Sequence, residues 1–151
     1  MYIKNFIQQF NDKKLKIFVD MDGVIVDYIL NDLDYSNKRP LTSNIKKLEE
    51  ISKMNNTELY ILSVSRTDKG VEQKHVWLDE FAPIFKKENR VIISIENNDL
   101  GFASKIKTNY LKNLKRDGNL IIVIDDDPRV LKDIYRENKD IILLKDSALI
   151  D

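Results

Sequence analysis

Five short apolar segments, rich in β-branched residues, constrain the fold of this chain more than any other feature. They lie at 15–20, 59–63, 90–95, 120–125 and 141–144. None alternates cleanly between apolar and polar residues, which is typical of strands buried on both faces of a parallel sheet. The longest apolar run, LIIVI, is far shorter than the roughly 20 residues that cross a bilayer. We therefore expect a buried parallel sheet and no membrane partner.

The segments between these runs predict helices. Apolar residues recur at helical spacing in 45–54, 105–116 and 128–137. The polar residues 42–44 predict a cap for the first of these helices, and the Asp117–Gly118 pair predicts the end of the second. Strands that alternate with helices predict an α/β fold, with a doubly wound, Rossmann-like parallel sheet of five strands. Ligands of such folds bind beyond the carboxyl ends of the strands.

Length and charge limit the remaining choices. The 151 residues match the usual size of one domain, so we expect a single domain over 1–151. Lys and Arg number 25 and so do Asp and Glu, which means that any attraction to nucleic acid must be local. The chain has no cysteine, so disulfides and thiolate zinc sites are excluded and carboxylates are the expected metal ligands. The first residues do not resemble a secretory signal, and we expect a cytoplasmic protein.

Acidic side chains follow two of the predicted strands. Asp20 and Asp22 come directly after the first strand, Ser63 ends the second, and Asp125 and Asp126 end the fourth. Because the carboxyl ends of parallel strands meet at one edge, these carboxylates should converge there. Their mutual repulsion is costly unless a cation neutralises it. Mg²⁺, which prefers oxygen ligands, is the expected cofactor.

These segments resemble the four motifs of the haloacid dehalogenase superfamily of phosphotransferases. Its Asp-x-Asp-Gly motif stands here as DMDGV at 20–24, and its strand ending in Ser or Thr stands as YILS, ending at Ser63. Its lysine at the start of a helix is matched by Lys107, which has apolar residues three, four and seven positions later. Its acidic strand end stands as IIVIDD, ending at Asp126. The resemblance covers roughly 15–144.

The resemblance implies a phosphatase mechanism. Asp20 would be the nucleophile that forms an aspartyl-phosphate, and Asp22 would protonate the leaving oxygen and later activate water. Ser63 would bind a phosphoryl oxygen, while Lys107 would neutralise charge on the phosphate and on Asp20. Ser65 competes with Ser63 for this role.

The same resemblance implies the ligands of a magnesium ion. Asp20 and the backbone carbonyl of Asp22 would bind the metal, with Asp126 as the first choice from the fourth strand and Asp125 as the second or an outer ligand. Asp127 directly precedes a proline, and this position favours a helix cap over a metal ligand. Lys105 remains an alternative to Lys107, although the helical periodicity places the two lysines on opposite faces.

Two subfamilies resemble the chain locally and suggest a substrate. DMDGVIVDY at 20–28, with the stretch from Lys74 to Trp77, is similar to bacterial deoxyribonucleotidases. ILSVSR resembles the phosphatase domain of polynucleotide kinase-phosphatases, in which an Arg two positions after the Ser contacts phosphate; here Arg66 stands three positions after Ser63. A nucleotide or a nucleic-acid 3′-phosphate end is therefore expected ahead of a sugar phosphate.

The spacing of the motifs leaves little room for a substrate-covering cap. Only the residues at 24–40 remain for an insertion after the first motif, so we expect a minimal cap or none. Such an open site would admit a large substrate or borrow a lid from another subunit. Two alternatives to the enzyme remain. LIIVIDDDPRVL at 120–131 also resembles the phosphate-accepting strand of a receiver module, and the fold could also serve as a binding scaffold without catalysis.

Overall fold

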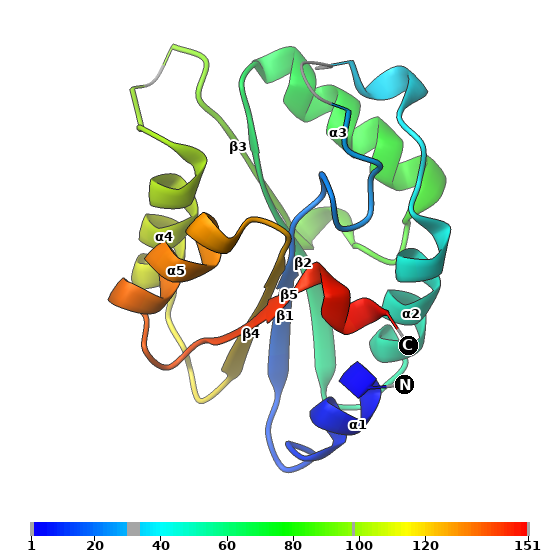
Figure 1. The fold of residues 1–151 in the computed structure, drawn as a ribbon, viewed down its shortest axis with the longest axis vertical. Helices are drawn as coiled ribbons and strands as arrows, with labels where there is room; N and C mark the ends of the chain where they lie inside the picture. The colour runs from blue at the N-terminus through cyan, green and yellow to red at the C-terminus, as the bar shows by residue number, and fades with distance from the viewer. Residues whose placement is uncertain (1, 30–33, 98, 151) are drawn as a thin grey trace.

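The fold is built on a five-stranded parallel sheet (Figure 1). The computed structural model describes residues 2–29, 34–97 and 99–150. The strands are β1 (Leu15–Val19), β2 (Thr57–Ser65), β3 (Arg90–Ser94), β4 (Leu120–Asp125) and β5 (Ile142–Lys145). Every neighbouring pair runs parallel, in the spatial order β3-β2-β1-β4-β5. The predicted α/β class and its five strands are confirmed.

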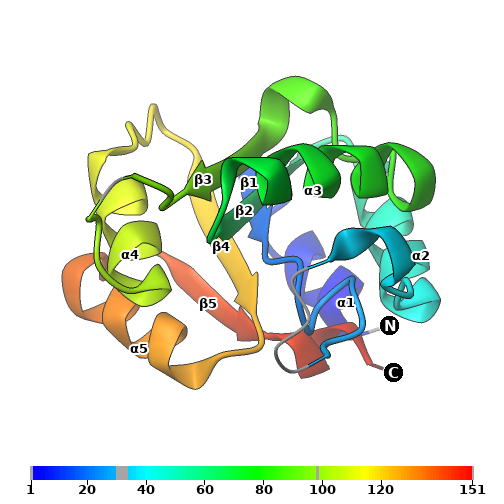
Figure 2. The same cartoon turned by 90° about the horizontal axis from the view of Figure 1, so that it is seen from above.

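Helices cover both faces of the sheet. They are α1 (Tyr2–Gln8), α2 (Thr42–Ser52), α3 (Asp68–Phe81), α4 (Ala103–Asn113) and α5 (Pro128–Glu137), with short 3₁₀ turns η1 (Tyr35–Asn37), η2 (Lys87–Asn89) and η3 (Asp146–Leu149). Figure 2 shows α4 and α5 on one side of the sheet and α1, α2 and α3 on the other. This arrangement is the doubly wound architecture that the sequence predicts. None of the helices in the described ranges is long and apolar enough to cross a membrane.

Two apolar cores explain why the strands lack polar alternation. Ile17 and Val19 of β1 pack into the core under α1, α2 and α3. Phe18, between them in sequence, packs into the second core against α4 and α5. Because successive side chains of a strand point to opposite faces, a strand covered on both faces is apolar at most positions and does not alternate.

The start of α5 follows the sequence prediction closely. Asp127 is the N-cap, and its carboxylate accepts a hydrogen bond from the backbone amide of Arg129 at 2.9 Å. Pro128 occupies the first helical position, where the missing N–H costs nothing. The cap and the proline fix the direction in which the chain leaves β4.

Two predicted helix ends are wrong. Helix α2 begins with Leu41 as its N-cap and has no side-chain cap bond; Asn44 instead donates to the carbonyl of Val24 at 2.7 Å. Helix α4 ends at Asn113, so Asp117 and Gly118 do not cap it. Both have positive φ values, +49° and +77°, and form a separate tight turn before β4. In both cases the polar residue that would suit a helix cap has another role: Asn44 binds the loop after β1, and Asp117 forms part of the turn before β4.

The segment after β1 forms a short flap. Within its described residues, Val26 makes isolated β-bridges to Asp22 and to Pro40. The amide of Asp27 donates to the carbonyl of Arg39 at 2.8 Å, and the segment contains the turn η1. Residues 30–33, which belong to the predicted insertion at 24–40, lie outside the described residues. The described part of this insertion contains no cap domain.

Candidate active site

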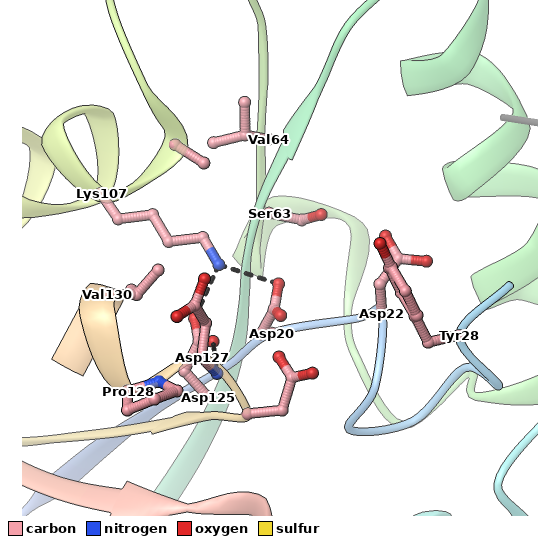
Figure 3. Close-up of a pocket in the computed structure, with 12 residues that line it drawn as sticks. Asp20, Asp22, Tyr28, Ser63, Val64, Lys107, Asp125, Asp127, Pro128 and Val130 are labelled. Atoms are coloured by element: carbon pink, nitrogen blue, oxygen red, sulfur yellow. Dashed lines mark hydrogen bonds and ion pairs between the residues drawn. The ribbon is translucent and has the colours of Figure 1, made fainter. Parts of the chain in front are cut away.

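A cavity of about 420 Å³ lies at the carboxyl edge of the sheet (Figure 3). Six of the seven side chains predicted from the sequence line it, namely Asp20, Asp22, Ser63, Lys107, Asp125 and Asp126. They lie in β2, β4 and α4 and in the residues that directly follow β1 and β4, which are far apart in the sequence and meet at this edge. The predicted convergence of carboxylates therefore exists in the structure.

The backbone after β1 holds the first motif against β4. The amide of Asp20 donates to the carbonyl of Ile124 at 3.0 Å, which continues the β1–β4 pairing by one residue. Gly23 follows with φ +82°, a conformation that residues with a side chain rarely adopt. A Cβ at this position would also collide with the carboxylate of Asp126. Gly23 thus lets the loop turn directly over the acidic end of β4.

Three carboxylates form a tight cluster in this cavity. Oxygen atoms of Asp20, Asp125 and Asp126 all lie within 4.8 Å of one another. This set of oxygen donors fits a hard divalent cation such as Mg²⁺. Burial raises the pKa of Asp20 to about 7, although nearby Lys107 lowers it. Burial, together with Asp125, raises the pKa of Asp126 to about 6. Burial is the main cause of both pKa shifts, and repulsion from neighbouring carboxylates adds to it; a bound cation would offset both effects.

Lys107 lies between two of these carboxylates. Its Nζ is 2.9 Å from Oδ1 of Asp20 and 2.8 Å from Oδ2 of Asp125, as the dashed lines in Figure 3 show. The residue is only 4% exposed. Burial lowers the pKa of Lys107, but the two carboxylates outweigh burial and raise it above its usual value. Lys105 is exposed and does not line the cavity, so the structure brings Lys107 alone of the two into the site.

Asp125 uses both carboxylate oxygens within the protein. Oδ2 accepts from Lys107, and Oδ1 accepts from the backbone amide of Asp127 at 3.0 Å. Asp125 is 1% exposed, whereas Asp126 lies at the half-buried margin of the cavity. Asp126 is therefore better placed than Asp125 to bind a metal directly. Asp127, as predicted, caps α5.

Ser63 faces a buried lysine that the sequence analysis did not assign to the site. Nζ of Lys74 donates to Oγ of Ser63 at 2.7 Å and to the carbonyl of Val64 at 2.9 Å. An ammonium group can only donate, so Oγ of Ser63 accepts and its own hydrogen stays available to another acceptor. Ser65 instead donates to the carbonyl of Thr67 at 2.8 Å and does not line the cavity.

Asp22 lies between two buried lysines. Its carboxylate is 3.3 Å from Nζ of Lys38, in the flap, and 3.8 Å from Nζ of Lys74, on α3. The ring of Tyr35 contacts both ammonium groups, with centroid distances of 4.4 and 5.3 Å. Trp77 anchors the flap by donating to the carbonyl of Lys38 at 2.9 Å. Burial lowers the pKa of Lys74, while Asp22 opposes this shift.

A sequence signal exists for Lys74 but not for Lys38. Lys74 and Trp77 are three positions apart, so one face of α3 presents both toward β2 and the flap. No comparable signal marks Lys38, which lies in an irregular segment among other polar residues.

Arg66 is the one predicted site residue that the structure separates from the others. It is exposed in the turn between β2 and α3 and does not line the acidic cavity. It lines a neighbouring cavity of about 670 Å³ instead. The extra residue between Ser63 and Arg66 moves the arginine past the end of the cavity that contains Ser63.

Comparisons with known proteins support the fold class. No protein-family model matches the chain, and no curated protein sequence matches it significantly. Among solved structures, a chain in the structure of the Pnkp1/Rnl/Hen1 RNA repair complex superposes with a TM-score of 0.63 at 13% sequence identity. The match covers 89% of this chain and 43% of that chain, so this chain spans less than half the length of its structural neighbour. Fold and site together define an α/β protein with a carboxylate and lysine site at the edge of its sheet.

Proposed function

We propose that this protein is a magnesium-dependent phosphomonoester hydrolase of the haloacid dehalogenase type. Its substrate would be a nucleotide or a nucleic-acid end that carries a 3′-phosphate. The position of Lys107 supports this proposal most directly. One buried ammonium group bridges Asp20 and Asp125 in the cavity that Ser63 also lines. The structural neighbour from an RNA repair complex supports nucleic-acid ends as the first substrates to test.

In the first half of the reaction, Oδ of Asp20 attacks the phosphorus atom. A bond forms between this oxygen and phosphorus, and the bond from phosphorus to the substrate's ester oxygen breaks. The Asp22 carboxyl group gives a proton to the departing oxygen, which leaves as an alcohol. Lys107 and the free hydrogen of Ser63 stabilise the charge on the phosphoryl oxygens.

In the second half, water attacks the phosphorus of the aspartyl-phosphate. Asp22, now ionised, takes a proton from this water, and the bond between phosphorus and Asp20 breaks. Inorganic phosphate leaves, and both aspartates return to their starting states. Lys38 and Lys74 hold Asp22 at the margin of the cavity, where it can serve both steps.

The metal would be held by Asp20, Asp126 and the backbone carbonyl of Asp22. When bound, it would neutralise the phosphoryl oxygens and the carboxylate cluster during transfer. Asp125 would not bind the metal directly, because its two oxygens hold Lys107 and the start of α5 in place.

The direct test is turnover of an aryl phosphate and of 3′-phosphorylated nucleotides, with Mg²⁺ and with excess chelator. We expect hydrolysis that chelator abolishes and that Mg²⁺ restores. Full activity in chelator would contradict the metal dependence. If the protein bound phosphorylated compounds without turning any of them over, a non-catalytic binding scaffold would replace the enzyme.

A further inference from the structure

A second, larger cavity opens beside the acidic one. It lies between the start of α4 and the outer side of α5, two helices that lie next to each other in Figure 1. The two cavities share Ala103, Asp127 and Val130 in their linings, so they adjoin each other. A ligand longer than the acidic cavity would therefore reach the lining of the second one. The proposed mechanism assigns no role to this space.

Positive charge collects in this second cavity. Arg66, Arg129, Lys132 and Arg136 line it, against two carboxylates, Asp127 and Asp133. The lining thus has two positive charges in excess, although the chain as a whole is neutral.

The ion pairs leave two of the cations available to a ligand. Arg129 pairs with Asp127 at 3.2 Å, and Arg136 pairs with Asp133 at 3.7 Å. Within residues 2–29, 34–97 and 99–150, Arg66 and Lys132 have no ion pair. Such a local excess attracts the phosphates of a nucleic acid.

An exposed aromatic ring lies in the same lining. Phe102, directly before α4, is 84% exposed, an unusual position for a large apolar side chain. Proteins that bind single-stranded nucleic acids combine cations along the backbone with aromatic rings on which bases stack. A small sugar phosphate would use neither feature.

We propose that this groove, formed by Arg66, Phe102, Arg129, Lys132 and Arg136, binds the nucleotides that precede the terminal phosphate of a single strand. The inference rests on the proposed function, because it takes the acidic cavity as the place where the 3′-phosphate is removed. The substrate would then be a polynucleotide end and not a free mononucleotide. Arg66 would contact the strand backbone and not the phosphate that is cleaved.

The kinetic test compares 3′-phosphorylated thymidine with 3′-phosphorylated oligothymidylates of two, four and eight residues. We expect kcat/KM to rise at least tenfold with length, and this gain to shrink as salt is raised. The double variant Lys132→Gln/Arg136→Gln should lose most of the gain on the octamer. It should keep normal turnover of an aryl phosphate, because neither residue lies in the acidic cavity.

A matched control removes the same charge elsewhere. Lys13 and Lys14 are exposed just before β1, at the opposite end of the sheet. Lys13→Gln/Lys14→Gln should leave the preference for long substrates unchanged. Equal losses in both double variants would overturn the proposed groove, because total charge alone would then explain the effect. Phe102→Ala should weaken octamer binding severalfold without altering the charge.

A binding measurement separates this inference from the proposed function. Fluorescence anisotropy with a labelled octamer that ends in a 3′-hydroxyl requires no turnover. Binding that the groove variants weaken supports the groove even if no phosphatase activity is found, in which case only the proposed function fails. If the mononucleotide and the octamer are hydrolysed equally well and the groove variants behave as wild type, the groove is wrong and the phosphatase stands.

Discussion

Buried charges are neutralised in different ways on the two sides of the acidic cavity. On one side, which we call the carboxylate side, Asp20, Asp125 and Asp126 form a cluster, and the single ammonium group of Lys107 bridges Asp20 and Asp125. On the other, which we call the lysine side, Lys38 and Lys74 surround the single carboxylate of Asp22. When ionised, the carboxylate side has two negative charges in excess, the charge of one divalent cation. The lysine side needs no added ion.

This difference predicts different roles for the two sides of the cavity. The carboxylate side should depend on metal, and its substitutions should alter metal binding and the chemical step. The lysine side should depend on packing among α3, the flap and β2, and its substitutions should alter how Asp22 and Ser63 are positioned. The following predictions test this division.

The largest effect is expected for Asp20→Asn, which keeps the shape of the side chain but removes the nucleophile. Turnover should fall by roughly 10⁴-fold or more, while the fold survives. In the wild type, rapid acid quench with a labelled substrate should trap phosphate on Asp20. Near-normal turnover in the variant, or label on another residue, would favour a metal-activated water as the nucleophile.

The next effect separates the two lysines at the start of α4. Lys107→Ala should lower kcat about 100-fold, because it removes the cation between Asp20 and Asp125. Lys105→Ala is the matched control on the exposed face of the helix, and its kcat should stay within about twofold of wild type. A larger loss at Lys105 would show that the substrate approaches from outside the cavity.

Metal affinity should distinguish neighbouring aspartates. Asp126→Ala should weaken Mg²⁺ binding by about 10- to 100-fold, as measured by calorimetric titration. Asp127→Ala should leave Mg²⁺ affinity nearly unchanged and instead lower thermal stability, since Asp127 caps α5. Equal losses of affinity in the two variants would contradict the assignment of Asp126 as the direct ligand.

On the lysine side, Lys74→Met should lower kcat about tenfold through Ser63. Without the ammonium donor, the hydroxyl of Ser63 loses the bond that orients its hydrogen. The effects of Lys74→Met and Ser63→Ala should therefore not add in a double-mutant cycle. Lys69→Met, on the exposed first turn of the same helix, is the control. Additive effects would show that Lys74 acts independently of Ser63.

The smallest expected effect concerns stability without metal. Because burial raises the pKa of Asp20 from 3.8 to about 7, the folded state holds this proton more tightly than the unfolded state. The contribution of Asp20 to stability is therefore full below pH 4 and is lost as pH rises towards 7. Asp20→Asn has no such loss, so its Tm advantage over wild type should grow to roughly 5 °C across this range. An advantage that does not change with pH would contradict the raised pKa.

The sequence predicts the carboxylate side far better than the lysine side. The carboxylates follow apolar runs, and parallel strands necessarily bring their carboxyl ends to one edge, so Asp20 and Asp126 can be placed from pattern alone. Asp127 and Pro128 are similarly informative, because a cap followed by proline has few other uses. For these residues, the local sequence preference and the fold topology predict the same position in the structure.

Lys38 could not be identified in this way, and the only sequence signal for Lys74 is its spacing from Trp77 on α3. Lysine is abundant along the chain and usually solvated, so the residue type alone does not distinguish a buried ammonium from an exposed one. Their burial depends on the flap folding over α3, where Trp77 meets the carbonyl of Lys38. The same limit explains the error at Asn44, whose side chain binds the loop after β1 instead of capping α2.

Gly23 sets a limit on how far this sequence can vary. Its backbone conformation disfavours most side chains, and a Cβ there would in addition collide with Asp126. Gly118 has a similar φ but no atom within 4 Å of the place of a Cβ, so asparagine or aspartate would be tolerated there. Two glycines that look alike in the printed sequence therefore differ in mutational tolerance. We therefore expect a variant that keeps the acidic end of β4 in place to keep glycine at position 23.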